Sequence, residues 1–182
     1  QETLPSAPPT IPSLATTGTP LPPTPPVAPR GPLVAPTEKI EGHLRVGFDV
    51  LAGYTFQMAK EDAGVAQAGE PAVAAKAFGQ TPEIVRKLDG QKVLLTGFLL
   101  PMKMEGPLAT EFLLVANSML CCYGVVPDMN QWVVVKMTKG GVKPQQDTPV
   151  QFFGTLRVQP RFDAGALSAI YHLDAERPRV AK

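Results

Sequence analysis

The chain has 182 residues, of which 44% are hydrophobic and 18% charged, and its formal net charge is +1. This length fits one ordinary domain with an additional segment. Lysine and arginine are scattered rather than grouped, which argues against a nucleic-acid partner, because a surface that binds nucleic acid needs clustered cations. No apolar run approaches the roughly 18 residues that span a bilayer.

Residues 1–37 are predicted to form an extended arm. Of the 21 prolines, 12 precede Thr37, and Glu2 and Arg30 are the only charged residues of this segment. Proline breaks helices and lacks an amide donor, so the arm should be polyproline II or disordered. Aromatic grooves receive Pro-x-x-Pro segments, and the prolines that we expect to contact a partner are Pro22, Pro23, Pro25 and Pro26. A spacer or a glycosylated stalk is the plainer interpretation.

The chain begins Gln1-Glu2-Thr3 without an initiator Met. We interpret this start as the result of proteolytic removal of a presequence, although a trimmed recombinant chain would begin in the same way. A polar start rich in Pro, Thr, Ser and Ala is common after export. We therefore expect a periplasmic or otherwise exported protein.

Residues 38–80 are predicted to be a lead-in segment that ends in a loop rich in Ala and Gly. Residues 46–50 alternate like a strand and a turn follows, while the alanines of residues 71–78 favour a frayed helix. A second helix is predicted to start at Thr81-Pro82-Glu83. Thr81 can cap it and Pro82 suits its first position, and Asp89-Gly90 ends it.

Residues 81–176 are predicted to form the folded domain, followed by a tail at 177–182. The expected strands are 92–100, 110–115, 131–137, 149–158 and 167–173. The first of them is apolar on both faces, so it should be a central strand or a strand that is covered on both sides. The fourth alternates most clearly, and its inward positions should be Val150, Phe152, Gly154, Leu156 and Val158.

These short strands and glycine-containing loops predict a mainly β fold. The arrangement that we expect is a small five-stranded OB-like antiparallel barrel with a short helix, preceded by the Pro-rich arm, and an SH3-like barrel is the next choice. Gly97 and Gly154 lie in the middle of predicted strands. A missing side chain there lets a strand coil or bulge, as closing a small barrel requires.

The two cysteines, Cys121 and Cys122, are adjacent. Neighbouring Cα atoms lie about 3.8 Å apart, below the roughly 4.4 Å lower edge of ordinary disulfides, so a bridge between them would be strained and comparatively reducible. Buried thiols or a structural bridge are the plainest interpretations. Copper(I) bound with help from Met119 or Met129 is an alternative, as is zinc with His43 and His172 as further ligands. The candidate metal or redox residues are therefore Cys121, Cys122 and Met119, and no other cofactor is expected.

The sequence does not predict an enzyme. Composition allows Cys122 as a nucleophile with His172 as its base, but His172 is expected to face solvent on the last strand. No glycine-rich phosphate loop, metalloprotease histidine pair or nucleophile elbow is present. Tyr123 and Trp132 lie beside an irregular segment and are predicted to contact a partner, although a core position is the plainer interpretation of Trp132.

Three motifs resemble those of an uncharacterised family of exported bacterial proteins that contain a domain of unknown function. They are Thr96-Gly-Phe-Leu-Leu-Pro101, Thr110-Glu-Phe-Leu-Leu114 and Leu120-Cys-Cys-Tyr-Gly124. The resemblance covers residues 48–174 and is most specific at the cysteines. It implies a periplasmic partner of a transporter system with ties to metal homeostasis. Some members have a single cysteine followed by histidine where this chain has Cys122-Tyr123.

The sequence thus predicts an exported, non-enzymatic binding or structural subunit. Its OB-like domain is expected to be tethered through the Pro-rich arm to a larger protein assembly of the envelope, which can be membrane-associated. The alternative is a periplasmic accessory protein that handles copper or zinc, or performs thiol redox chemistry, through Cys121 and Cys122. Neither hypothesis assigns a nucleic acid or a membrane span to the chain.

Overall fold

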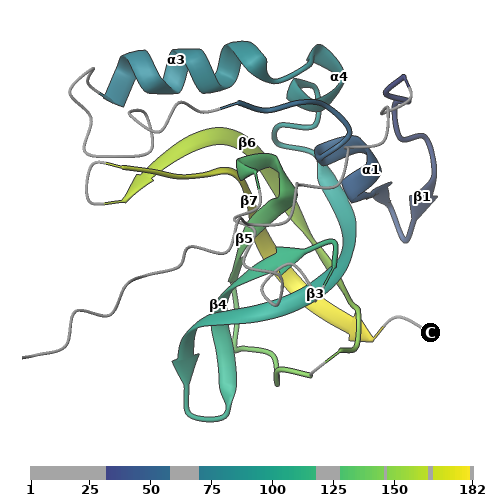
Figure 1. Ribbon diagram of the computed structural model, residues 1–182. Helices are drawn as coiled ribbons and strands as arrows, with labels where there is room; N and C mark the ends of the chain where they lie inside the picture. Colours follow the sequence, from purple (N-terminus) through teal and green to yellow (C-terminus); the bar gives the residue numbers. More distant parts are fainter. Residues whose placement is uncertain (1–31, 58–69, 118–127, 146, 164–165, 181–182) are drawn as a thin grey trace, which may run out of the picture.

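The computed structural model describes residues 32–57, 70–117, 128–145, 147–163 and 166–180. The elements in chain order are β1 (Lys39–Ile40), β2 (His43–Val46), α1 (Phe48–Leu51), α3 (Glu70–Gln80), α4 (Glu83–Arg86), β3 (Lys92–Glu105), β4 (Leu108–Val115), the 3-10 helix η2 (Met129–Gln131), β5 (Trp132–Met137), β6 (Val150–Asp163) and β7 (Ala166–Val180). The fold is mainly β, as predicted (Figure 1). The first 31 residues of the expected arm lie outside the described part of the chain.

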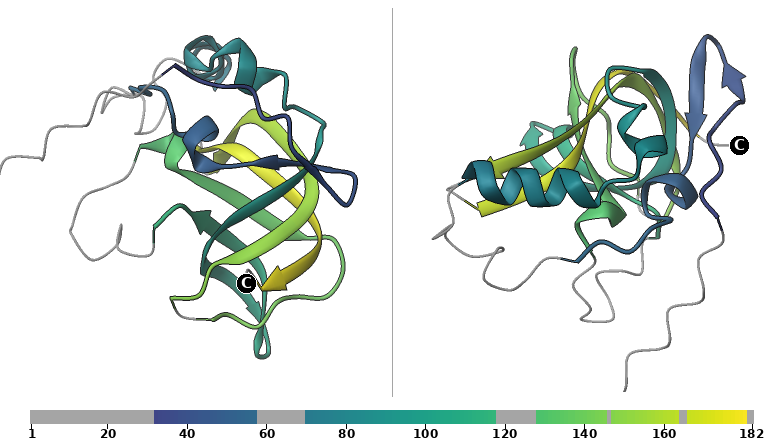
Figure 2. Two further views of the ribbon diagram at one scale, coloured as in Figure 1. Left: turned by 90° about the vertical axis from the view of Figure 1, so that its right-hand side faces the viewer. Right: turned by 90° about the horizontal axis from the view of Figure 1, so that it is seen from above.

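The strands form one seven-stranded sheet in the order β1-β2-β3-β4-β5-β7-β6, and β6 also pairs with β3. Strands β3, β4, β5, β7 and β6 therefore close into a ring of five, which the two views of Figure 2 show from the side and from above. The expectation of an antiparallel sheet is wrong at two places, because β2–β3 and β5–β7 pair in parallel. The ring is joined by two further strands, β1 and β2, that the sequence did not predict as a pair.

β3 is the central strand, which confirms the prediction from its two apolar faces. Its first half, up to Gly97, pairs with β2 on one side and β6 on the other, and its second half pairs with β4. At Gly97 the strand passes so close to β4 that an added Cβ would lie 2.7 Å from the carbonyl oxygen of Val115. The missing side chain therefore permits the change of partner at this point.

β6 and β7 form the longest pairing of the sheet and supply much of the core. The predicted inward side chains of β6 are confirmed, since Val150, Phe152, Leu156 and Val158 all belong to the core cluster. β7 contributes Tyr171 and Leu173 from the opposite strand. Residues 177–180, expected in a tail, are the end of β7.

The helices differ in detail from the prediction. The expected strand at 46–50 is wrong beyond Val46, because residues Phe48–Leu51 form α1. The frayed helix expected at 71–78 is the regular helix α3, which lies against β6 and β7 at one end of the ring (Figure 1). Thr81 does not cap α4; the capping position is Pro82, and the Thr81 hydroxyl donates to the Ala77 carbonyl 3.2 Å away. None of the described helices has the length and apolar content needed to cross a membrane.

The β1–β2 hairpin covers an outer part of the ring. Glu41, at its turn, pairs with Arg177 and with Arg179, 2.8 Å away, on β7. The Arg177 guanidinium lies 3.7 Å from the ring centre of Phe153, and the His43 ring meets the same phenyl ring at 5.1 Å. Phe153, which alternates with the predicted inward residues and so should point outward from β6, is therefore fully buried on that side.

The first described residues already contact the domain. Leu33, assigned from the sequence to the extended arm, is half-buried and packs against the core beside α1. Gly53 makes room for it, because a Cβ there would lie 2.5 Å from the Leu33 Cδ2. The described end of the arm is thus held at the surface of the domain.

Candidate functional site

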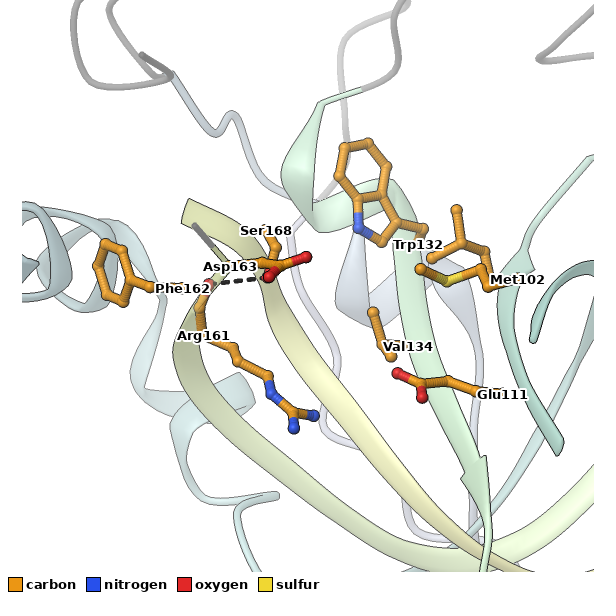
Figure 3. Close-up of a pocket in the computed structure, with 9 residues that line it drawn as sticks. Met102, Glu111, Trp132, Val134, Arg161, Phe162, Asp163 and Ser168 are labelled. Carbon is orange, nitrogen blue, oxygen red and sulfur yellow. Dashed lines mark hydrogen bonds between the residues drawn. The ribbon is translucent and has the colours of Figure 1, made fainter. Parts of the chain in front are cut away.

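A hollow of about 370 Å³ lies on the outer face of the ring, over β4 and β5 (Figure 3). Phe112, Leu114, Val133 and Val135 point into the core. Because side chains alternate along a strand, the intervening residues of β4 and β5 face outward and form the floor of the hollow. The residues that line it are Met102, Glu111, Leu113, Trp132, Val134, Arg161, Phe162, Asp163 and Ser168. We call this group the β4–β5 hollow.

Trp132 stands at the upper end of the β4–β5 hollow, where β5 begins. It pairs in register with Val115 of β4 and is half-buried, outside the core cluster. Its indole ring rises beside Met102, whose side chain is 59% exposed, and the indole nitrogen faces the hollow (Figure 3). The core interpretation of Trp132 is therefore wrong, and its contact with a partner stays a prediction.

Charged groups stand on both sides of the hollow. Figure 3 shows the side chains of Glu111, from β4, and Arg161, from β6, pointing toward one another, while the Asp163 carboxylate lies on the side of the indole nitrogen. The Ser168 hydroxyl donates to the Arg161 carbonyl 3.1 Å away and joins β7 to β6 where their register shifts. The Phe162 ring points away from the hollow and packs on the core.

The charged residues that line the hollow carry no excess of positive charge. They are Glu111, Asp163 and Arg161, two carboxylates and one cation, with a net charge of −1. Within the described residues, neither Glu111, Arg161 nor Asp163 takes part in an ion pair. These groups are therefore available to a ligand.

His172 lies on the same outer face, paired in register with Val134. It was expected to face solvent, but it is half-buried, and both ring nitrogens are buried without a hydrogen-bond partner among the described residues. Burial and, to a smaller extent, the charge of Arg161 lower the pKa of His172 from 6.5 to about 4, although Asp174 acts in the opposite direction. His172 is therefore neutral near pH 7.

The depressed pKa of His172 predicts a pH dependence of stability. Between pH 6.5 and about 4 the His172 ring binds a proton in the unfolded chain but not in the folded chain. The contribution of His172 to the free energy of unfolding is therefore complete above pH 6.5 and is lost as the pH falls toward 4. We expect a loss of about 1–2 kcal/mol in unfolding free energy, after allowance for the partial exposure of the ring. Urea titrations at several pH values should show a flatter profile for His172→Gln; parallel profiles would contradict the prediction.

Several predicted site residues lie in segments outside the described part of the chain. Cys121, Cys122, Met119 and Tyr123 lie outside the described residues, as do Pro22, Pro23, Pro25 and Pro26. The proposed zinc histidines lie on different strands, His43 on β2 and His172 on β7, and the His43 Nδ1 hydrogen bonds to the Glu41 carbonyl at 2.9 Å. In the described ranges, no three His, Cys, Asp or Glu side chains gather as a metal site would require.

Most of the polar residues of the hollow were not predicted. Alternation along β4 could have placed Glu111 outward beside Leu113, but it could not identify the strand opposite them. Arg161 and Asp163 follow Pro160 and lie between the predicted strands at 149–158 and 167–173. In the structure β6 continues to Asp163 and carries both side chains to the hollow.

A family model described as "Protein of unknown function (DUF3299)" matches residues 37–179. The chain is similar to the crystal structure of a DUF3299 family protein from Pseudomonas aeruginosa, with 27% identity and a TM-score of 0.53, over 77% of this chain and 97% of that one. Similarity to a structure named as an aspartyl-tRNA synthetase from Leishmania major is weaker, with 10% identity and a TM-score of 0.36 over 82% of this chain and 23% of that one. No curated protein matches the chain.

Proposed function

Because this chain belongs to the DUF3299 family of proteins of unknown function, we propose a function from its own residues: it is a non-enzymatic binding subunit that holds its ligand or partner at the β4–β5 hollow. The observation that carries the proposal is the position of Trp132, half-buried outside the core and flanked by unpaired charged groups. Aromatic side chains in such positions supply much of the binding energy of protein surfaces.

The strand order supports an OB-like arrangement of the ring. We number the five strands β3, β4, β5, β6 and β7 from 1 to 5 in chain order. Their hydrogen-bonded order around the ring is then 1-2-3-5-4, and strand 4 closes the ring by pairing with strand 1. OB folds bind ligands on the face of their second and third strands, between the loops that join the first two and the last two strands. The β4–β5 hollow occupies this face, with Met102 on the β3 side and Asp163 on the β6–β7 side.

The tether and the compartment are also part of the proposal. The Pro-rich arm is expected to connect an exported, periplasmic domain to a larger envelope assembly, because proline-rich chains are extended and are recognised without folding. Leu33 fixes the described end of this arm on the domain. Binding of the arm to the assembly would therefore also hold the folded domain close to that assembly.

The charged groups of the hollow suit binding better than catalysis. Arg161 and Asp163 are exposed, and Glu111 is half-buried. A catalytic acid or base is normally held in surroundings that shift its pKa and pair it with a second group. We therefore propose that these side chains donate and accept hydrogen bonds without taking part in a reaction.

Photo-crosslinking in the cells that produce the protein tests the proposed function. A photoreactive amino acid at Leu113, inside the hollow, should give specific adducts, whereas the same amino acid at Lys139, in the exposed turn after β5, should not. Deletion of residues 1–31 should abolish co-purification with the assembly, while residues 32–37 are kept because Leu33 packs on the core. Equal adducts at both positions would contradict a binding role of the hollow.

Metal handling or thiol redox chemistry by Cys121 and Cys122 is the alternative function, suggested by the most specific motif of the family resemblance. Metal analysis and thiol titration of the purified native protein separate the two. Stoichiometric copper or zinc that is lost in a Cys121→Ser/Cys122→Ser variant would favour the alternative. Adducts at Leu113 that persist in this variant would favour the binding subunit.

A further inference from the structure

We propose that the β4–β5 hollow binds a neutral oligosaccharide, an inference that rests on the proposed binding function and specifies its ligand. The hollow combines one half-buried indole, from Trp132, with carboxylates and a guanidinium on its sides. Sugar rings present an apolar face that stacks on aromatic rings, and each hydroxyl both donates and accepts hydrogen bonds. A surface that holds sugars therefore needs an aromatic plane beside both donors and acceptors.

The positions of the polar groups meet this need. The Asp163 carboxylate lies on the side of the hollow that the indole nitrogen faces (Figure 3), and there it can accept hydrogen bonds from the hydroxyl groups of a sugar. Glu111 and Arg161 point toward one another from opposite sides of the floor. The Glu111 carboxylate supplies hydrogen-bond acceptors and the Arg161 guanidinium supplies donors for a second sugar unit. The hollow thus offers two groups of polar side chains, one beside the indole and one across the floor.

The charge of the hollow itself favours a neutral ligand. Nucleic acids and sulfated glycans require an excess of cations, whereas the charged residues that line the hollow, Glu111, Asp163 and Arg161, carry two negative charges and one positive charge. A phosphate or sulfate bound to Arg161 would lie beside carboxylates. A neutral chain of hydroxyl groups meets no such repulsion.

The test uses the full chain and the fluorescence of its single tryptophan. Cellohexaose, maltohexaose and hexa-N-acetylchitohexaose are titrated and binding is confirmed by calorimetry, with a heparin oligosaccharide and a 12-nucleotide oligothymidine as anionic comparisons. We expect at least one neutral hexasaccharide to shift the Trp132 emission and to bind more tightly than both anions. Trp132→Ala should weaken its binding about tenfold or more, because the stacking surface is lost.

Two further variants keep the inference testable if Trp132→Ala is poorly folded. Asp163→Asn, at an exposed position, should weaken binding of the hexasaccharide and leave the fold intact. Phe78→Ala removes an exposed aromatic residue of α3 outside the hollow and should leave the affinity for the hexasaccharide unchanged. Absence of binding by all three hexasaccharides, or tighter binding of an anion, overturns the inference. Protein adducts at Leu113 would in that case still support the binding subunit, and cleavage of a bound hexasaccharide would overturn only its non-enzymatic nature.

Discussion

Gly154→Ala should lower the free energy of unfolding by about 2–4 kcal/mol, because the added methyl group has no room between β6 and β7. A Cβ at this position would lie 2.2 Å from the Asp174 carbonyl oxygen and 2.9 Å from the Ala175 Cα. Both are backbone atoms of β7, so they cannot move aside without displacing the strand. The register of β6 and β7 also shifts between Phe153 and Gly154, which indicates that the glycine forms part of a bulge.

A second glycine provides the matched control for this substitution. Gly79 lies in α3, and a Cβ there would meet no atom within 4 Å. Gly79→Ala should therefore stabilise the protein by about 0.5–1 kcal/mol, because alanine costs less backbone entropy in a helix. Urea denaturation followed by circular dichroism measures both variants. Equal stability of Gly154→Ala and the parent chain would mean that β6 and β7 do not approach one another as closely as described.

The strands could be predicted where a local pattern determines the structure. The alternation along β6 identified its core residues, and the two apolar faces of β3 identified a central strand. Both predictions succeed because a strand buried on one face alternates between apolar and polar residues, whereas a strand buried on both faces is apolar throughout. The role of Phe153 could not be predicted in this way. Its position on β6 is outward, and it is buried only because His43 and Arg177, distant in sequence, cover it.

Non-local pairing explains the other differences. β1 and β2 contain two and four residues, too few for a clear period, and β2 is held by parallel pairing with β3. The β4–β5 hollow shows the same limit. Trp132 was predicted as a contact residue from its type, whereas Arg161 and Asp163 gain their place only through the long β6–β7 pairing. The sequence therefore identifies single candidate residues of a site made from several strands, but it does not show which residues the pairing of distant strands brings beside them.

Tyr171→Phe should cost about 1–3 kcal/mol of unfolding free energy, because a buried carbonyl loses its hydrogen-bond donor. The Tyr171 hydroxyl donates to the Leu51 carbonyl at 2.8 Å, and its oxygen lies 2.7 Å from that of Tyr54. Burial raises the pKa of both tyrosines, so both remain protonated over the working range of pH. The bond to Leu51 connects α1 to β7 across the core, and phenylalanine keeps the ring while it removes this bond and the one shared with Tyr54.

The same variant should also alter the candidate site. The Asn130 side chain donates to the Tyr54 carbonyl at 2.8 Å and belongs to η2, which leads directly into Trp132. Loosening the segment around Tyr54 should therefore shift the emission of Trp132 even in the folded protein. In a double-mutant cycle, Tyr54→Phe and Tyr171→Phe should together cost less than the sum of the single losses, because the two hydroxyls share one hydrogen bond. Additive losses with unchanged emission would show that the core tyrosines do not support the position of Trp132.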